Sequence, residues 1–174
     1  KGTMPGKALK EYIDSADSTG AFNKEELQCL EEVLNDWHKD PGRDYILLSC
    51  LEDGLLSGFL VYGKTPMTEH SYDLYWIVVS PDHQRKGIGR RLVKEMEEDI
   101  MRSSSRGIIR IETSGRSAYD GQRRFYLSLG YRESGRIQDF YSDGDDLVTY
   151  SKMIQAEKVN FSSSSQREFR NCSE

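Results

Sequence analysis

One apolar run constrains the fold more than any other segment of the chain. Residues 72–79, with the sequence Tyr-Asp-Leu-Tyr-Trp-Ile-Val-Val, are the longest such run and are rich in β-branched and aromatic side chains. This composition predicts a strand that is buried at the centre of a sheet. Apolar side chains at helical spacing follow in residues 87–102, and they are Ile88, Leu92, Val93, Met96 and Ile100. The two segments together predict a central strand that leads into an amphipathic helix.

The remaining pattern predicts further helices and strands on both sides of this pair. The predicted helices cover residues 8–13, 24–38 and 117–129, and the predicted strands cover residues 45–51, 55–62, 108–113, 131–136 and 147–154. Asn23 is expected to cap the second helix, and Asp53-Gly54 is typical of a hairpin turn. The polar segments 14–20 and 137–146 are expected to be loops. This order predicts one α/β domain with a mixed sheet, spanning residues 1–154.

Residues 155–174 are predicted to be a C-terminal tail outside that domain. They contain a run of four serines and few large apolar side chains. The segment 158–161 alternates like a short strand, so we expect the tail to pack along its own domain or a neighbouring chain. We expect no part for it in the chemistry.

Composition excludes several classes of protein. The 174 residues are 36% hydrophobic and 30% charged, with a net charge of −5, which predicts a globular domain without a transmembrane helix. The acidic balance argues against nucleic acid and membrane partners and fits small neutral or cationic ones. The three cysteines lack a CxxC pair and the three histidines lack a metal-ligand spacing, so neither a disulfide framework nor a metal site is expected. A reducing cytoplasmic setting without a signal peptide is the expectation.

The segment between the central strand and its helix predicts an anion site. Four cations, Arg85, Lys86, Arg90 and Arg91, crowd the helix N-terminus, where the helix dipole already favours an anion. A P-loop is excluded because no Gly-Lys-Ser/Thr occurs there. A dinucleotide fingerprint fits poorly, since Leu92 replaces the third glycine and seven residues separate the strand from Gly87.

Two segments resemble the GNAT N-acetyltransferases. The first is Gln84-x-x-Gly87-x-Gly89 after the central strand, and the second is Arg124-Phe-Tyr-Leu-Ser-Leu-Gly-Tyr131. The resemblance covers about residues 44–154. It implies a mixed, mostly antiparallel sheet flanked by helices, with acetyl-CoA as co-substrate. Because no convincing strand precedes residue 23, the first strand of that sheet is expected to be missing or replaced by another segment.

The resemblance also implies roles for individual residues. The backbone of Ile77, Val78 and Val79 would pair with the pantetheine arm of acetyl-CoA. The pyrophosphate would be held by the turn, whose residues are Gln84, Arg85, Lys86, Gly87, Ile88, Gly89 and Arg90. Tyr126 would be the general acid that protonates the departing thiolate, although its spacing also fits a core aromatic. Tyr119 stands where the family often has an asparagine that contacts CoA, so this contact is not expected.

The residue that accepts the amine proton has two candidates. Asp73 interrupts the apolar central strand, at the position where the histone-acetylating branch of the family has a glutamate. It also fits a structural carboxylate that pairs with an arginine. Glu112, near the end of the neighbouring strand, is the second candidate for the base. Trp76, Asp139 and Tyr141 are expected to line the acceptor pocket.

These observations predict an acetyl-CoA-dependent N-acetyltransferase that acts by direct attack of a small amine or amino-acid-like acceptor. Protein acetylation, at a lysine or an N-terminus, is the alternative within the same class. A non-catalytic acyl-CoA-binding module is the alternative outside it. The sequence leaves open whether the protein forms a homodimer.

Overall fold

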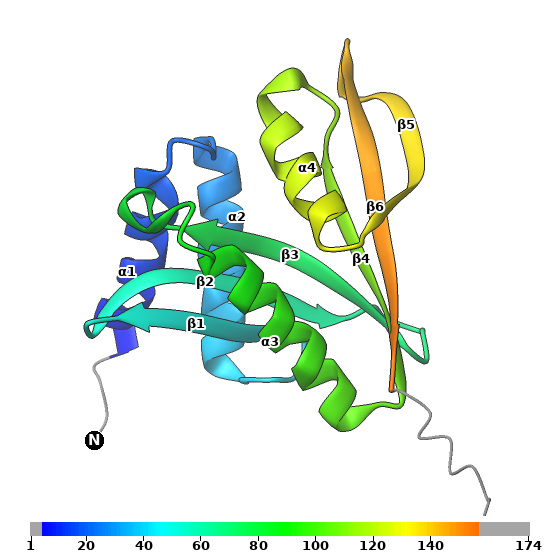
Figure 1. The fold of residues 1–174 in the computed structure, drawn as a ribbon. Coiled ribbons are helices and arrows are strands. Elements are labelled where there is room, and N and C mark those ends of the chain that lie inside the picture. The colour runs from blue at the N-terminus through cyan, green and yellow to red at the C-terminus, as the bar shows by residue number, and fades with distance from the viewer. Residues whose placement is uncertain (1–4, 157–174) are drawn as a thin grey trace, which may run out of the picture.

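A single mixed sheet organises the part of the chain that the computed structural model describes, which is residues 5–156. Its strands are β1 (Ile46–Glu52), β2 (Leu55–Lys64), β3 (Ser71–Val79), β4 (Arg106–Ser114), β5 (Arg132–Ser142) and β6 (Asp145–Gln155). They lie in the order β1-β2-β3-β4-β6-β5, and only the β3–β4 pair is parallel (Figure 1). The predicted mixed, mostly antiparallel sheet is confirmed. Within residues 5–156 no strand precedes the first helix, and β1 forms one edge.

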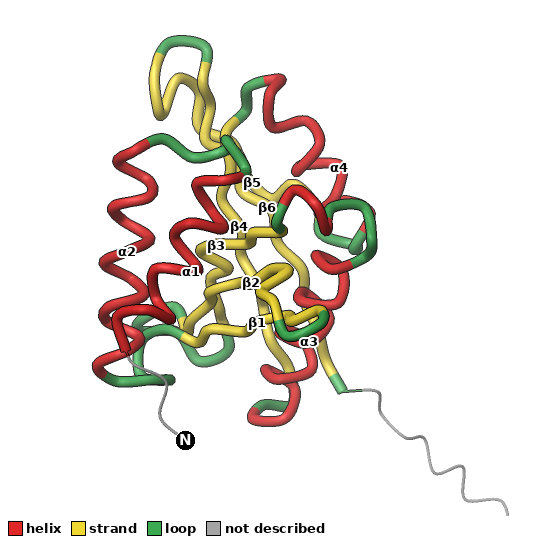
Figure 2. The backbone as a smooth tube through the Cα atoms, turned by 90° about the vertical axis from the view of Figure 1, so that its left-hand side faces the viewer, coloured by secondary structure: helices red, strands yellow, loops and turns green. Residues whose placement is uncertain are grey.

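The helices cover both faces of this sheet. They are α1 (Pro5–Ser18), α2 (Lys24–Lys39), α3 (Ile88–Ser103) and α4 (Asp120–Ser128), with short 3₁₀ turns at Pro81–His83 and Ser117–Tyr119. Figure 2 shows α1 and α2 on one face and α3 and α4 on the other. No helix in the described range is long and apolar enough to cross a bilayer.

Local signals start α2 as the sequence predicts. Asn23 accepts a hydrogen bond from the backbone N–H of Glu26, and the Glu26 carboxylate accepts one from the backbone N–H of Asn23. This reciprocal capping box satisfies two backbone donors at the helix start.

The predicted loop over residues 14–20 is wrong, because α1 continues to Ser18. Burial of Ala16 explains the extension, since tertiary packing outweighs the weak helix propensity of the surrounding Asp and Ser residues.

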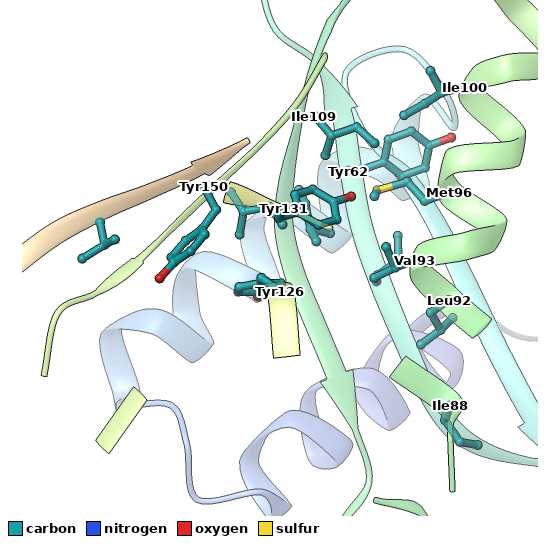
Figure 3. Close-up of a cluster of buried hydrophobic side chains, with 14 residues drawn as sticks. Tyr62, Ile88, Leu92, Val93, Met96, Ile100, Ile109, Tyr126, Tyr131 and Tyr150 are labelled. Atoms are coloured by element: carbon teal, nitrogen blue, oxygen red, sulfur yellow. The ribbon is translucent and has the colours of Figure 1, made fainter. Parts of the chain in front are cut away.

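The core has two layers because β2 is buried on both faces. Leu60 and Tyr62 face α3 and pack with Met96 and Ile109 in the cluster of Figure 3. The alternate β2 side chains face α1 and α2 and join a second cluster, which includes Phe59, Val61, Leu30 and Leu34. This alternation follows from the two-residue period of a strand.

The feature that shapes the site is the divergence of β3 and β4. Their parallel ladder extends only from the pair Ser71–Ile108 to the pair Leu74–Ile111. At that point β3 carries an irregularity, because its pairing with β2 passes from Leu74 to Trp76 and leaves Tyr75 as an extra residue. A bulge bends a strand and increases its twist. Beyond Tyr75 the two strands separate, which Figure 1 shows above the centre of the sheet.

The predicted loop over residues 137–146 is wrong as well. β5 continues to Ser142, and a tight turn with Gly144 at φ 77° leads directly into β6. The strand predicted over residues 131–136 therefore extends further than expected, because residues 137–142 are exposed and lack the apolar alternation that reveals a strand. The predicted tail lies outside the described residues from position 157 onward, as does its strand-like segment 158–161.

Candidate active site

A pocket of about 600 Å³ lies where β3 leaves β4. Its walls are the end of β3, the turn before α3, the first residues of α3 and the inner side of α4. The backbone N–H of Ser80 donates to the carbonyl of Ser57 on β2. Because hydrogen-bonding directions alternate along an antiparallel strand, Val78 also faces β2, whereas Ile77 and Val79 direct their backbone groups into the opening. That edge of β3 can therefore pair with an extended ligand.

The turn before α3 offers a set of backbone donors. The N–H groups of residues 85–90 make no hydrogen bond to another residue in the range 5–156. Arg85 and Gly87 adopt left-handed conformations with φ of 60° and 81°, which turn successive N–H groups toward one side. The side chain of Gln84 secures the turn, because its Nε2 donates to the carbonyl of Val79 at 3.2 Å. This geometry, at the N-terminus of a 16-residue helix, suits a pyrophosphate.

The basic side chains around this turn do not all face the pocket. Arg85 and Arg90 line it. Arg91 instead pairs with Glu52 of β1, and this contact lowers the pKa of the Glu52 carboxyl. The cations of this segment thus include two that line the pocket and one, Arg91, that pairs α3 with β1.

Gly89 lines the pocket at the start of α3, and a side chain there would meet other lining residues. A Cβ there would lie 3.1 Å from Cζ of Phe125 and 3.7 Å from Cγ2 of Val79, both of which line the pocket. Gly89→Val is therefore expected to weaken acetyl-CoA binding at least about tenfold, because the backbone of the turn needs close approach to the anion. Isothermal titration calorimetry measures the loss.

Gly135→Val provides the matched control for this substitution. Gly135 lies on the exposed strand β5, and the nearest atom to a Cβ added there would be 4.0 Å away. Gly135 does not line the pocket. The Gly135→Val protein should bind acetyl-CoA with the affinity of the wild type. Unchanged affinity in a folded Gly89→Val protein would refute the binding site.

A second pocket, of about 330 Å³, adjoins the first across the opening in the sheet. The two share Phe22, Ile77, Gln122 and Tyr126 as lining residues. The second pocket is further lined by Glu112 at the end of β4, by Trp76 of β3 and by Tyr141 of β5. The structure thus brings these three predicted residues together beside Tyr126. Asp139 does not line either pocket, because its Oδ1 accepts the backbone N–H of Gly144 at 2.6 Å and holds the β5–β6 turn.

Tyr126 occupies the junction of the two pockets. It is 6% exposed, and its hydroxyl forms no hydrogen bond to another residue within the described part of the chain. Burial raises the pKa of Tyr126 to about 12. The hydroxyl is therefore protonated at neutral pH and is able to donate a proton to a group in either pocket.

Asp73 lies outside both pockets. Its Oδ1 accepts a hydrogen bond from Nε of Arg110 at 2.6 Å, and its Oδ2 accepts one from Oγ1 of Thr65 at 2.8 Å. The carboxylate is 6% exposed, so both oxygens are used internally. This is the arrangement of a structural ion pair, and the structure does not bring Asp73 to Tyr126 as it does Glu112.

The substitution Asp73→Asn is expected to act on stability. It removes the shorter of the two ion pairs of Arg110 and leaves only the contact with Glu112 at 3.6 Å, which should lower the free energy of unfolding by about 1–2 kcal/mol. The cost is below that of a fully buried pair because Arg110 is half exposed. Denaturant unfolding measures the change. The control Asp14→Asn breaks the exposed ion pair with Lys10 and should leave stability within about 0.5 kcal/mol. A loss of turnover in Asp73→Asn without loss of stability would contradict the structural role.

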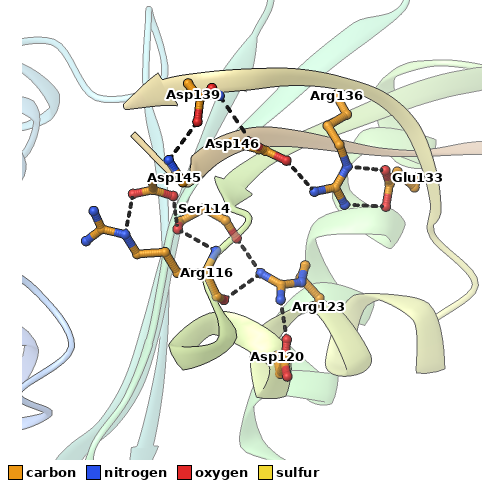
Figure 4. A network of polar contacts seen from close by, with 10 residues as sticks. Ser114, Arg116, Asp120, Arg123, Glu133, Arg136, Asp139, Asp145 and Asp146 are labelled. Atoms are coloured by element: carbon orange, nitrogen blue, oxygen red, sulfur yellow. Dashed lines mark hydrogen bonds and ion pairs between the residues drawn. The ribbon is translucent and has the colours of Figure 1, made fainter. Parts of the chain in front are cut away.

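A polar network holds the wall of the second pocket that β5 and β6 supply (Figure 4). The buried Asp145 accepts a hydrogen bond from Ser114 of β4, and its Oδ2 lies 3.2 Å from Nε of Arg116. Arg136 lies 2.9 Å from Asp146 on the same hairpin. These contacts fix the hairpin against the end of β4, where Glu112 lies.

Sequence reasoning missed the contribution of the N-terminal helices to this site. Phe22 of the α1–α2 connection lines both pockets, and Glu26 of α2 lines the second. Phe22 packs edge-on against Trp76, with ring centroids 5.2 Å apart. The only local signal was the capping pattern at Asn23, which predicts where a helix starts but not that this helix lies beside the opening in the sheet.

No cluster of three metal-ligating side chains occurs within residues 5–156.

The sheet splits beside a helix N-terminus, and an acidic pocket adjoins this split. The sequence model described as the Acetyltransferase (GNAT) family matches residues 11–131, and the chain belongs to this family.

Individual relatives agree with this assignment. A Desulfovibrio desulfuricans protein assigned to the GNAT acetyltransferases is 33% identical, with a TM-score of 0.81 over 84% of this chain and 92% of that one. The ribosomal protein bS18-alanine N-acetyltransferase of Escherichia coli strain K12 is 25% identical over 76% of this chain and 86% of its own length. An aminoglycoside 6'-N-acetyltransferase complexed with coenzyme A shares the fold, with a TM-score of 0.69 at 16% identity over 88% of this chain and 94% of that one.

Proposed function

We propose that the protein transfers the acetyl group of acetyl-CoA to a primary amine of a small or amino-acid-like acceptor. The larger pocket would hold the donor, with the pyrophosphate at residues 84–90 and the pantetheine arm along Ile77 and Val79. The smaller pocket would hold the acceptor. One observation carries the proposal: Tyr126 lines both pockets, and Glu112 lines the acceptor side of the same opening.

The proposed chemistry is a direct transfer. The amine nitrogen attacks the thioester carbonyl carbon, and the carbon–sulfur bond breaks as the carbon–nitrogen bond forms. Glu112 takes the proton that the amine loses, and Tyr126 gives its proton to the departing thiolate. Cys29 and Cys50 line neither pocket, which supports a route without an acetylated cysteine.

Release of free CoA thiol from acetyl-CoA tests this function. The panel contains alkylamines, free amino acids and short peptides, and mass spectrometry identifies the acetylated product. We expect amine-dependent thiol release with a small primary amine. Binding of acetyl-CoA without release by any amine would leave only an acyl-CoA-binding module, which the presence of Glu112 beside Tyr126 argues against.

A protein N-terminus is the second candidate for the acceptor. The observation that favours it is the 25% identity to an enzyme that is named for the alanine of ribosomal protein bS18. Peptides with a free N-terminal alanine, compared with the same peptides carrying an N-terminal acetyl group, separate this activity from transfer to small amines. A cytoplasmic location remains a prediction from the cysteine pattern.

A further inference from the structure

The acceptor pocket carries more negative charge than the transfer reaction uses. The charged side chains that line it are Glu26, Glu112, Asp145 and Arg116. Arg116 and Asp145 lie 3.2 Å apart and neutralise each other. Nη1 of Arg110 lies 3.6 Å from Glu112, and Arg110 lines neither pocket. Two carboxylates, those of Glu112 and Glu26, therefore face the pocket, and Glu26 has no cation partner within residues 5–156.

Glu26 has no task in the transfer that we propose. Its carboxylate forms no ion pair with any residue in the range 5–156, and one of its oxygens accepts the backbone N–H of Asn23 at 2.8 Å. A capping box works with glutamine as well as with glutamate, so the cap does not require the charge. The helix dipole favours an acidic group there only modestly, and the exposed Glu25 beside it supplies one. The charge of Glu26 is left for an occupant of the pocket.

The carboxylates converge on the same part of the pocket. The pKa of Tyr141 is raised first by burial and then by the negative charges of Glu112, Asp145 and Glu26. The pKa of Tyr119 is raised by burial and by the negative charges of Glu26 and Asp145. Both rings line the pocket, together with Tyr75 and Trp76. Aromatic faces next to carboxylates favour organic cations, because the ring quadrupole and the carboxylate both attract positive charge.

We infer that the acceptor is a small compound with at least two cationic amino groups, one aligned for acetylation beside Glu112 and the other bound by Glu26. This inference rests on the proposed function and adds a substrate class to it. A monoamine or a peptide N-terminus brings one cation and leaves Glu26 without an opposite charge in the pocket, so a second amino group adds an attraction that a monoamine lacks. A pocket of about 330 Å³ lies at the lower end of the range for small-molecule sites, which suits an aliphatic diamine.

The comparison of 1,4-diaminobutane with butylamine tests this inference in the full-length protein. The two amines have the same carbon chain and differ by one amino group. We expect kcat/KM for the diamine to exceed that for butylamine by about tenfold or more, well beyond the factor of about two that two equivalent amines contribute. Equal values after this correction, or a preference for a peptide with a free N-terminus over the diamine, would overturn the inference.

Glu26→Gln tests whether Glu26 causes the preference for the diamine over butylamine. The glutamine keeps the capping box, so thermal unfolding should stay close to that of the wild type. The diamine should lose about tenfold more in kcat/KM than butylamine does, mainly through KM, and the preference should fall to about the statistical factor of two. Glu25→Gln is the matched control, because Glu25 is the adjacent, exposed residue that lines neither pocket. An equal loss for both amines in Glu26→Gln would show a general structural effect and refute the assignment.

Calorimetry with acetyl-CoA and thiol release with butylamine keep the two proposals separate. Normal acetyl-CoA binding and butylamine acetylation without a diamine preference would refute the dicationic acceptor and leave the proposed function intact. Acetyl-CoA binding without acetylation of any amine would refute the proposed function, and the inference with it.

Discussion

Tyr126→Phe is expected to lower kcat about 100-fold while the affinity for acetyl-CoA stays unchanged. The substitution keeps the buried ring and removes only a hydroxyl that has no protein partner within residues 5–156, so packing should be preserved. The departing thiolate then lacks its proton donor. Steady-state kinetics gives kcat, and calorimetry gives the affinity for acetyl-CoA.

Tyr131→Phe is the matched control for this change. Tyr131 is also fully buried and packs against Tyr126, but its hydroxyl donates to Glu97 at 3.1 Å and it lines neither pocket. Its substitution should lower the melting temperature and leave kcat within about twofold. If Tyr126→Phe turns over like the wild type, the proton comes from another group.

The raised pKa of Tyr126 determines how kcat should depend on pH in alkaline solution. A general acid works only while it is protonated, and the pKa of Tyr126 is raised to about 12. Raising the pH from 7 to 10 should therefore cause no loss of kcat through this residue, whereas an ordinary tyrosine with a pKa near 10 would be about half ionised at the upper limit. A fall in kcat centred below pH 10 that disappears in Tyr126→Phe would show that the hydroxyl titrates lower than its burial implies.

The proposed donor half of the site could be predicted from sequence because its parts are contiguous. The strand, the turn and the helix over residues 72–102 follow one another directly, and each has its own local signal: β-branched and aromatic residues, paired glycines and a 3.6-residue apolar period. The structure shows the same order in β3, the turn and α3. The positions of Gly87 and Gly89 beside the opening follow from that continuity.

The acceptor half could not be predicted in the same way because distant segments assemble it. Glu26 and Phe22 precede β4 by 80 residues or more, and only the packing of α1 and α2 on the sheet brings them to the opening. The sequence predicts only the first part of β5, because residues 137–142 are exposed and have no apolar period that distinguishes them from a loop. Asp73 shows the same limit: the sequence leaves open a catalytic carboxylate and a structural one paired with an arginine, and only the neighbouring strand supplies Arg110 to pair with it.

Glu112→Gln is expected to lower kcat/KM for the amine about 100-fold at pH 7, because the variant lacks the carboxylate that accepts the amine proton. The side chain is 45% exposed and lines the acceptor pocket, so a glutamine of the same size fits without repacking. Asp73→Asn, measured alongside, should retain kcat/KM within a few-fold despite its lower stability.

The pH dependence of this loss separates a base from a positioning group. An aliphatic amine has a pKa near 10, so at pH 7 nearly all of it carries the proton that must leave before attack. As the pH approaches 10 the free amine becomes abundant and the need for a base diminishes, while Tyr126 stays protonated. The ratio of wild-type to Glu112→Gln activity should therefore shrink from about 100 toward about 10 over this range. A ratio that is constant with pH would assign Glu112 to substrate positioning, and a pH-dependent loss in Asp73→Asn would place the base on β3.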